Sequence, residues 1–303
     1  MQNTKLSQTD NRFMLSLTSL KAEEFLELLP HFDLLWQRYH AQYDLQGKPR
    51  RIEKSKEHDS MSLKGSIMKL LFVLIYLKNN PLQSYHGMVF NMSQGKVSQW
   101  LNVLLPLLEE SLCRARLLPD RTPGHLYLSL QLLAGQAIFM DATERAVPRA
   151  IDDEKQQVEY SGKKGCHTNK NLLVTSEKGQ VLYLSPTVEG SLHDKALADE
   201  LELEFITDQL LLVDLGFLGY QPKNAQVYMP VKKPRNGELS NYQKAYNKLI
   251  SSIRVSVEHV MAGVKRLRIV KDKIRLKKNQ IRDRVMYIAC GLHNLRIASR
   301  NLS

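Results

Sequence analysis

The sequence predicts an α/β protein in which an all-helical region precedes a mixed sheet with flanking helices. Residues 17–118 place apolar side chains at helical spacing. Residues 136–231 instead contain five short β-rich runs, with one helical stretch between the third and the fourth. Strands that alternate with helices are typical of the α/β class. The chain has 303 residues, which is enough for about two domains.

The composition excludes several classes of protein. With 43% apolar residues the chain can bury a sizeable core, but it has no apolar run of about 18 residues, so we expect no membrane span. The first residues lack the apolar core of a signal peptide. The three cysteines form no CxxC pair, which argues against a disulfide framework or a zinc knuckle. We therefore expect a cytoplasmic protein with no membrane partner.

Basic charge is concentrated in the last quarter of the chain. The net charge of the whole chain is +12, but residues 221–303 hold 19 Lys and Arg against 4 Asp and Glu, a net of +15. A localised basic surface favours a polyanion, and double-stranded DNA is the partner that we expect. An anionic membrane is disfavoured because residues 271–278, KDKIRLKK, offer few bulky apolar side chains for insertion.

Residues 1–59 are expected to form a helical N-terminal region and a linker. Leu17 to His40 show helical apolar spacing, and Pro30 within them should break the helix. Residues 47–60, GKPRRIEKSKEHDS, are polar, charged and nearly free of apolar side chains. Such a composition is typical of a loop, so this segment is predicted to be a linker.

Residues 60–118 are expected to form a helix-turn-helix. Ser62–Lys78 reads as a largely buried helix, and a short helix at Leu82–Phe90 follows it. Ser93 is a good N-cap for a further helix that starts at Gln94. The order of helix, tight turn and helix is the arrangement that a helix-turn-helix uses to enter a major groove.

The helix that starts at Gln94 carries the candidate DNA-reading side chains. Gln94, Lys96 and Gln99 lie off its apolar face. Amide and lysine side chains near an exposed helix N-terminus are suited to hydrogen bonds with base edges. Pro106 should kink or break the helix near Leu105. The alternative interpretation is an ordinary small helical bundle without a DNA-reading role.

Residues 119–124, PDRTPG, are predicted to be a domain boundary, so that residues 125–303 form a second domain. A helix is expected at residues 192–205. The strands of this domain are expected at residues 136–143, 171–175, 181–188, 209–214 and 227–231.

A long helix is predicted at Asn247–Arg268, after the last strand. Its expected apolar face consists of Ile250, Ile253, Val257, Val260, Met261, Val264 and Leu267. A narrow polar stripe borders that face and consists of Asn247, Ser251, Arg254, Glu258 and Lys265. A carboxylate at such a border is partly desolvated, as a metal ligand is. The alternative is a surface helix with an ordinary i,i+4 pair between Arg254 and Glu258.

Two of the apolar runs end in aspartate, at Asp141 and at Asp214. A buried strand that ends in Asp places its carboxylate at the sheet edge, where ligands gather, although Asp is also a common turn residue. Together with Glu258, these residues predict a shared acidic site. Three adjacent carboxylates repel one another unless a cation lies among them. Oxygen ligands favour Mg²⁺ or Mn²⁺, and we expect two ions, which is the arrangement used in phosphodiester cleavage.

A basic segment, YSGKKGCHTNKN at residues 160–171, lies between the two aspartates in the sequence. Lys163, Lys164 and His167 in this segment are suited to contacts with a DNA backbone. The alternative is a solvated hairpin. A zinc site at Cys166-His167 is disfavoured because no second Cys/His pair accompanies it.

Six segments, in order, resemble the catalytic domain of DDE-type transposases of bacterial insertion sequences, most closely the insertion-sequence-five family and its Harbinger-like relatives. The segments are MDATE (140–144), YSGKKGCHTNKN (160–171), GSLHDK (190–195), VDLGFLGY (213–220), PVKKP (230–234) and N-x3-S-x2-R-x3-EH (247–259). The N-terminal segments also resemble the helix-turn-helix of that family. The resemblance covers most of the chain from about Leu17.

The resemblance implies a ribonuclease H-like fold for residues 125–303, with catalytic acids on the first strand, the fourth strand and a later helix. By resemblance these acids are Asp141, Asp214 and Glu258, the same three residues that the patterning indicates. Phe217 stands where the family more often has Tyr, and Gly165-Cys166 where it has another basic residue. Neither departure removes an implied metal ligand.

Three further residues of the resembling segments are of secondary interest. Asp194 and Glu144 are competing acids, and His193 is a second-tier candidate together with Asp194.

The function implied by the resemblance is that of a DNA transposase, which cleaves the ends of an insertion sequence and transfers the 3′-OH into target DNA. Arg254, Lys265, Lys163 and Lys164 would position phosphates. Holding two element ends requires a homodimer or larger assembly, at the bacterial nucleoid. Two alternatives remain open: a catalytically silent DNA-binding protein, and a metal-dependent endonuclease that hydrolyses DNA without strand transfer.

Overall fold

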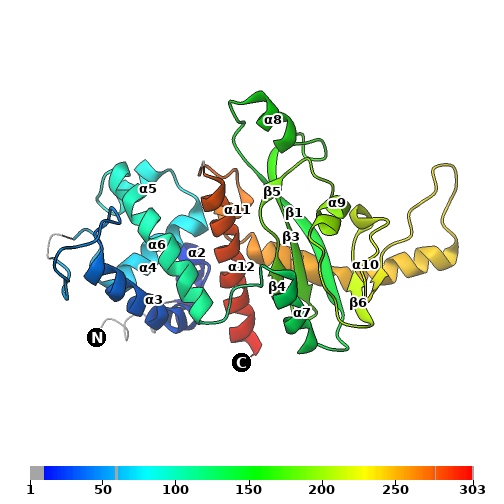
Figure 1. Cartoon of the computed structure of the whole chain (residues 1–303), viewed down its shortest axis with the longest axis horizontal. Helices are drawn as coiled ribbons and strands as arrows, with labels where there is room; N and C mark the ends of the chain where they lie inside the picture. Colours follow the sequence, from blue (N-terminus) through cyan, green and yellow to red (C-terminus); the bar gives the residue numbers. More distant parts are fainter. Residues whose placement is uncertain (1–9, 59–60, 277, 302–303) are drawn as a thin grey trace. The chain divides into compact units, whose positions relative to one another are not determined.

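The computed structural model describes residues 10–58, 61–276 and 278–301 (Figure 1). The chain divides into two compact units. Unit 1 comprises Met1–Leu118, Lys265–Asp272 and Arg284–Ser303, and unit 2 comprises Pro119–Val264 and Lys273–Asp283. None of the helices in the described ranges is long and apolar enough to cross a membrane.

Unit 1 is helical, as the sequence predicts. Its N-terminal helices are α2 (Asn11–Thr18), α3 (Ala22–Gln42), α4 (Gly65–Asn79), α5 (Gln83–Val89) and α6 (Gln94–Arg114). The expected N-cap of α6 is confirmed, because the Ser93 hydroxyl accepts a hydrogen bond from the backbone N–H of Lys96 at 3.3 Å. A tight turn separates α5 from α6, and the two helices pack against each other.

The two prolines that were expected to interrupt helices do not do so. α3 continues through Pro30, and α6 continues through Pro106. A proline inside a helix removes one backbone hydrogen bond and crowds the preceding turn. Burial outweighs this cost here, because both helices bury long apolar faces that include Phe32 and Trp36 in α3 and Trp100 in α6.

The C-terminal segments group differently from the limits expected at residues 125–303. α11 (Arg268–Lys271) and most of α12 (Asn279–Asn301) belong to the helical unit. Within that unit, the Asn294 amide donates to the carbonyl oxygen of Leu117 at 2.9 Å. The physical reason is the apolar face of α12, on which Val285, Met286, Ile288, Leu292 and Leu295 are all buried.

Unit 2 is built on a seven-stranded mixed sheet. The strands are β1 (Ile138–Ala146), β2 (Tyr160–Ser161), β3 (Cys166–Ser176), β4 (Val181–Leu184), β5 (Val188–Glu189), β6 (Gln209–Leu212) and β7 (Ala225–Tyr228). Their order is β2-β3-β1-β6-β7, with β4 and β5 also paired to β3. β1 is antiparallel to β3 and parallel to β6. The five predicted strand regions are present, and the region at 181–188 divides into β4 and β5.

Helices flank this sheet, which confirms the predicted α/β class. They are α7 (Pro123–Gln131), α8 (Asp153–Glu159), α9 (Asp194–Glu200), the single-turn η1 (Leu215–Phe217) and α10 (Asn241–Val264). α10 runs across the sheet and packs against β1 (Figure 1). The core between these layers includes Ile138, Met140, Leu172, Val174, Leu197, Phe205, Leu211 and Phe217.

The apolar face of α10 differs from the prediction at Ile253 and at Leu267. The helix ends at Val264, four residues before the expected Arg268, so Leu267 lies beyond it as the N-cap of α11. Ile250, Val257, Val260 and Val264 are buried, whereas Ile253 is 40% exposed. α10 also begins six residues earlier than expected, at Asn241.

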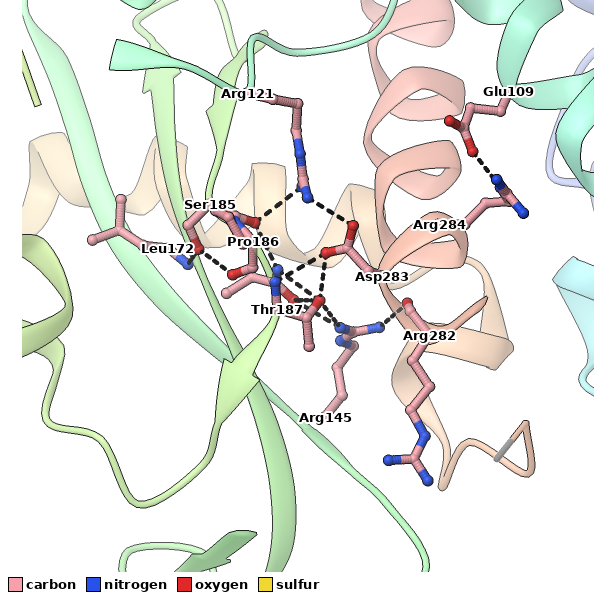
Figure 2. Close-up of polar contacts among 11 residues, drawn as sticks. Glu109, Arg121, Arg145, Leu172, Ser185, Pro186, Thr187, Arg282, Asp283 and Arg284 are labelled. Atoms are coloured by element: carbon pink, nitrogen blue, oxygen red, sulfur yellow. Dashed lines mark hydrogen bonds and ion pairs between the residues drawn. The ribbon is translucent and has the colours of Figure 1, made fainter. Parts of the chain in front are cut away.

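A polar cluster in unit 2 fixes the start of α12 to the sheet (Figure 2). One carboxylate oxygen of Asp283 accepts hydrogen bonds from the Thr187 backbone N–H at 2.9 Å and from its hydroxyl at 2.7 Å. The other oxygen accepts from the Arg121 guanidinium at 2.7 Å. Arg121 also donates to the carbonyl oxygen of Ser185 at 3.0 Å.

Arg145 on β1 is the buried member of the same cluster, with a relative exposure of 2%. Its guanidinium donates to Asn171 Oδ1 at 2.7 Å and to the carbonyl oxygen of Arg282 at 2.9 Å. β1 thus carries two charged residues with different roles: Asp141, which is a candidate site residue, and the buried Arg145, which binds the start of α12. The cluster fixes the strand that carries this aspartate.

Replacing Asp283 by Ala should lower the free energy of unfolding by about 2–4 kcal/mol, because it removes a charged acceptor from Thr187 and Arg121. The matched control is Asp272→Ala, which breaks only an i,i+4 pair with Arg268 that is largely exposed. That control should cost less than about 1 kcal/mol. Urea unfolding of the three proteins measures the difference. Equal losses for the two variants would show that the Asp283 cluster does not stabilise the fold.

Candidate active site

Two aspartates stand side by side in unit 2, at the point where β6 ends next to the middle of β1. β1 pairs in parallel with β6, with Ile138 opposite Leu211 and Phe139 opposite Leu212. Extending this register by two residues places Asp141, inside β1, level with Asp214, which follows the end of β6. The backbone of neighbouring parallel strands therefore delivers both carboxylates to the same point, as expected where ligands bind at strand ends.

The two carboxylates interact electrostatically. Burial, followed by the negative charge of Asp214, raises the pKa of Asp141 to about 6. The backbone N–H of Ala142, which donates to Asp141 at 2.9 Å, and the charge of Arg254 act in the opposite direction. A desolvated carboxylate that repels its neighbour favours either a bound proton or a bound cation.

Because Gly216 has no side chain, a third carboxylate can lie close to this pair. The Gly216 backbone N–H donates to Asp214 Oδ1 at 2.7 Å and so orients that side chain. A Cβ atom at position 216 would lie 2.8 Å from both Asp214 Oδ1 and Asp194 Oδ2. These two oxygens are therefore less than about 6 Å apart. Asp194 is the first residue of α9, and its charge also raises the pKa of Asp141.

Lys170 provides the positive charge that accompanies Asp194. The ammonium is 2.8 Å from Asp194 Oδ1 and 3.8 Å from Glu144 Oε1, and only 6% of the Lys170 side chain is exposed. Thr168 also donates to Glu144 at 2.8 Å. The sequence indicated that the basic segment around Lys170 contacts the DNA backbone. The structure instead buries this lysine as a counter-ion for the two competing acids.

α10 reaches the site through its polar stripe. The Asn247 side chain donates to the carbonyl oxygen of Val231 at 3.0 Å and accepts from its backbone N–H at 2.7 Å, so it ties the helix to the segment after β7. Two turns later, Arg254 is close enough to lower the pKa of Asp141. The polar stripe of α10 therefore contains Asn247, which anchors the helix, and Arg254, which faces the acidic site.

Glu258 lies one turn after Arg254 on α10 and is exposed. No group of three His, Cys, Asp or Glu side chains within the described residues is close enough to hold a metal ion. The structure therefore brings Asp141 and Asp214 together but does not assemble a trio with Glu258. Its role as a third ligand stays a prediction.

The basic candidates have different environments. Lys163 and Lys164 are exposed in the turn between β2 and β3, and His167 on β3 packs its ring against Tyr160, with the centroids 5.7 Å apart. His193 is exposed just before α9, and Lys265 is partly buried directly after α10, in unit 1.

The three candidate DNA-reading residues lie in unit 1, on the first turns of α6. Gln94 is exposed, and Lys96 and Gln99 are partly exposed. The first turn of α6 contains no acidic residue, and a helix N-terminus with its partial positive charge is favourable for phosphate.

Comparison with known proteins agrees with this arrangement. Residues 140–294 match the family described as DDE superfamily endonuclease, and residues 65–114 match the helix-turn-helix of DDE superfamily endonuclease. The chain belongs to the DDE superfamily of endonucleases. The probable transposase for insertion sequence element IS702 of Microchaete diplosiphon is 26% identical over 234 residues, which cover 76% of this chain and 80% of that protein. No solved structure matches.

In this DDE superfamily chain, two residues of the site region escaped the sequence analysis. Gly216 lies in the resembling segment at 213–220, but no pattern there indicates that it donates its N–H to Asp214 and leaves room for Asp194. Lys170 lies in the basic segment at 160–171, but it is buried. The clue for Lys170 was its position directly before the apolar strand run, because a strand that is covered on both faces buries successive residues, as β3 does from Thr168 to Ser176.

The raised pKa of Asp141 predicts a pH-dependent stability in EDTA. An Asp with a folded pKa of about 6 and an ordinary value of 3.8 binds its proton more tightly in the folded state. Stability should therefore fall as pH rises from about 4 to 6, by up to about 3 kcal/mol. Asp141→Asn should lack this component.

Thermal unfolding of both proteins across pH 4–7 measures this difference. Mg²⁺ should restore stability to the wild type at the upper end of the range, because a cation favours the ionised carboxylates. Identical pH profiles for the wild type and Asp141→Asn in EDTA would contradict the desolvation of this side chain.

Proposed function

We propose that this protein is a DNA transposase that cleaves DNA at the ends of an insertion sequence and joins the freed 3′-OH to target DNA. The observation that carries the proposal is the level placement of Asp141 and Asp214 on neighbouring parallel strands. It occurs in a chain whose DDE endonuclease region follows a helix-turn-helix region of the same superfamily. Cleavage and DNA recognition therefore have separate candidate regions.

The donor set of the site fits a hard divalent cation, Mg²⁺ or Mn²⁺, and we propose two ions per site. Asp141 and Asp214 supply carboxylate oxygens, the ligands that these ions prefer. When bound, such ions supply activation of the attacking oxygen and stabilisation of the leaving oxygen in an in-line displacement. Burial and the neighbouring charge of Asp214 raise the pKa of Asp141, and a bound cation would favour its ionised form.

The protein's own residues organise the DNA around this site. In the first step, a water oxygen forms a bond to phosphorus while the bond to the 3′ oxygen breaks, which leaves a 3′-OH. In the second step, that hydroxyl attacks a phosphodiester of the target, so one P–O bond forms as another breaks. Arg254, beside Asp141, would hold a phosphate oxygen, and Lys163, Lys164 and His167 would contact the backbone further along the strand.

Glu258 is our proposed third acidic ligand, and Asp194 is the competing candidate. Glu258 shares a helix face with Arg254, the residue of α10 that acts on Asp141. Asp194 lies close to Asp214 but is held by Lys170. Lys265, on the same stripe of the predicted helix, remains a proposed phosphate contact.

Substitution of the acids tests the catalytic proposal. Asp141→Asn, Asp214→Asn and Glu258→Gln keep the shape of each side chain but weaken it as a metal ligand, so each should abolish Mg²⁺-dependent nicking of end DNA without weakening end binding. Asp194→Asn is the matched comparison and should retain activity. Loss of activity in Asp194→Asn but not in Glu258→Gln would identify Asp194, and not Glu258, as the third acidic ligand.

The products distinguish the proposal from its two alternatives. A transposase gives joined products when the end DNA carries a free 3′-OH and target DNA is present. A simple metal-dependent endonuclease gives nicks without joined products. A catalytically silent DNA-binding protein gives neither, although it retains end binding. Because two ends must be held together for joining, we also propose a homodimer or larger assembly on DNA.

Recognition of the ends is assigned in this proposal to α6. Gln94→Ala combined with Gln99→Ala should cost roughly 1–3 kcal/mol of discrimination for each lost base contact, with unchanged nicking of non-specific DNA. The control, Gln37→Ala with Gln42→Ala, removes two exposed amides from α3 of the same unit. Competition binding between end and scrambled duplexes measures the effect. If both double variants discriminate equally well, α6 is not the reading helix.

A further inference from the structure

The predicted linker before the helix-turn-helix, residues 47–60, is bound along the C-terminal end of α3 over the part that the structure describes, residues 47–58. The Arg50 backbone N–H donates to the carbonyl oxygen of Gln42 at 2.7 Å, and its side-chain Nε donates to that of His40 at 3.0 Å. Further along, the Lys54 backbone N–H donates to the carbonyl oxygen of Ala41 at 3.1 Å. The segment that was predicted as a simple linker therefore has a defined path over unit 1.

A partly buried ion pair fixes the far end of the linker next to α6. Glu57 accepts hydrogen bonds from the Trp36 indole N–H at 2.5 Å and from the ammonium of Lys69 at 2.6 Å. Lys69 is completely buried and lies over two indole rings, 4.4 Å from the centre of Trp36 and 5.6 Å from that of Trp100. Because Trp100 belongs to α6, this arrangement sets the position of the linker relative to that helix.

Between the linker and the first turns of α6 lies a groove with a basic lining. One part of about 280 Å³ is lined by Arg50, Lys54 and His58 of the linker and by Lys96 and Gln99 of α6. A second part of about 440 Å³ adds Ser62, the N-cap Ser93 and the apolar side chains of Met92 and Trp100. The two parts share Leu45, His58, Met61 and Lys96.

The electrostatic balance of the groove favours an anion. Arg50, Lys54 and Lys96 are its cations, and Asp44 is its one acidic lining residue among those described. The Asp44 carboxylate already accepts hydrogen bonds from the backbone N–H groups of Gln46 at 2.8 Å and Lys48 at 2.9 Å. The partial positive charge at the N-terminus of α6 adds to the attraction.

We propose that the linker is a second DNA-binding element, which grips a backbone phosphate of the same duplex whose bases α6 reads. Arg50 and Lys54 hold the phosphate from the linker side, and Lys96 approaches it from the helix side. The occupant is duplex DNA, because a candidate base reader, Gln99, lines the same groove as these cations. The inference rests on the proposed assignment of end recognition to α6, and it gives the linker a positioning role in that recognition.

The test compares two double variants of equal charge change in the same linker. Arg50→Ala with Lys54→Ala removes the two groove cations of the linker and leaves Lys96 in place. Lys48→Ala with Arg51→Ala removes two exposed cations that do not line the groove. Affinity of the full chain for end DNA is measured against salt concentration without divalent metal. The groove variant should flatten the slope of log K against log salt by about two units, and the control by much less.

Two further measurements separate a lost contact from a disturbed fold. Lys54→Ala alone leaves the Arg50 bond to His40 intact and should flatten the slope by about one unit. A duplex with a neutral methylphosphonate at the contacted phosphate should bind more weakly than normal DNA to the wild type, but equally well to the groove variant. A scan of single methylphosphonates along the end sequence identifies that phosphate.

Equal slopes for the two double variants, or no methylphosphonate position that distinguishes the wild type from the groove variant, would overturn the inference. Tighter binding of an acidic peptide than of end DNA would overturn it as well. None of these outcomes bears on cleavage, which the acid substitutions test independently. If the wild type itself fails to discriminate end DNA, the proposed recognition by α6 fails first.

Discussion

The parallel pairing of β1 with β6 is the constraint on which the candidate site depends. The two strands are separated by more than sixty residues of sequence, yet two backbone partners, at Ile138 and Phe139, set their register. Because that register brings Asp141 level with Asp214, a shift of one residue would turn one carboxylate to the opposite face of the sheet. Burial of Met140 and Val213, the preceding residue on each strand, holds the register in place.

Bringing acids together has an electrostatic cost, and the surrounding residues reduce it without cancelling it. Lys170 neutralises Asp194 and Glu144 from below the surface, and Gly216 offers its N–H to Asp214 where any larger residue would collide. For Asp141, burial and the charge of Asp214 outweigh the Ala142 N–H and Arg254, so its pKa remains raised. A site with this residual negative charge is suited to binding cations and, through them, phosphates.

Unit 1 uses a buried charge for a different purpose. Lys69 lies between two indole rings and pairs with Glu57, so loss of one partner would leave a buried charge uncompensated. This ion pair fixes the position of the linker. A polar segment with few apolar side chains could not otherwise keep one path over α3. Polar anchoring at Glu57 substitutes for the hydrophobic burial that orders the helices.

The sequence alone determined the α/β class, the buried runs that carry Asp141 and Asp214 and the N-cap of α6, because apolar periodicity and capping are local properties. It did not determine the strand ends, since β1 continues past Asp141 to Ala146 and β6 ends at Leu212, before Asp214. Tertiary structure alone decided that α3 and α6 continue through their prolines, since burial outweighs a lost hydrogen bond. It also decided the burial of Lys170, the grouping of α12 with the helical unit and the path of the linker. These features depend on contacts between residues far apart in sequence, which no local pattern encodes.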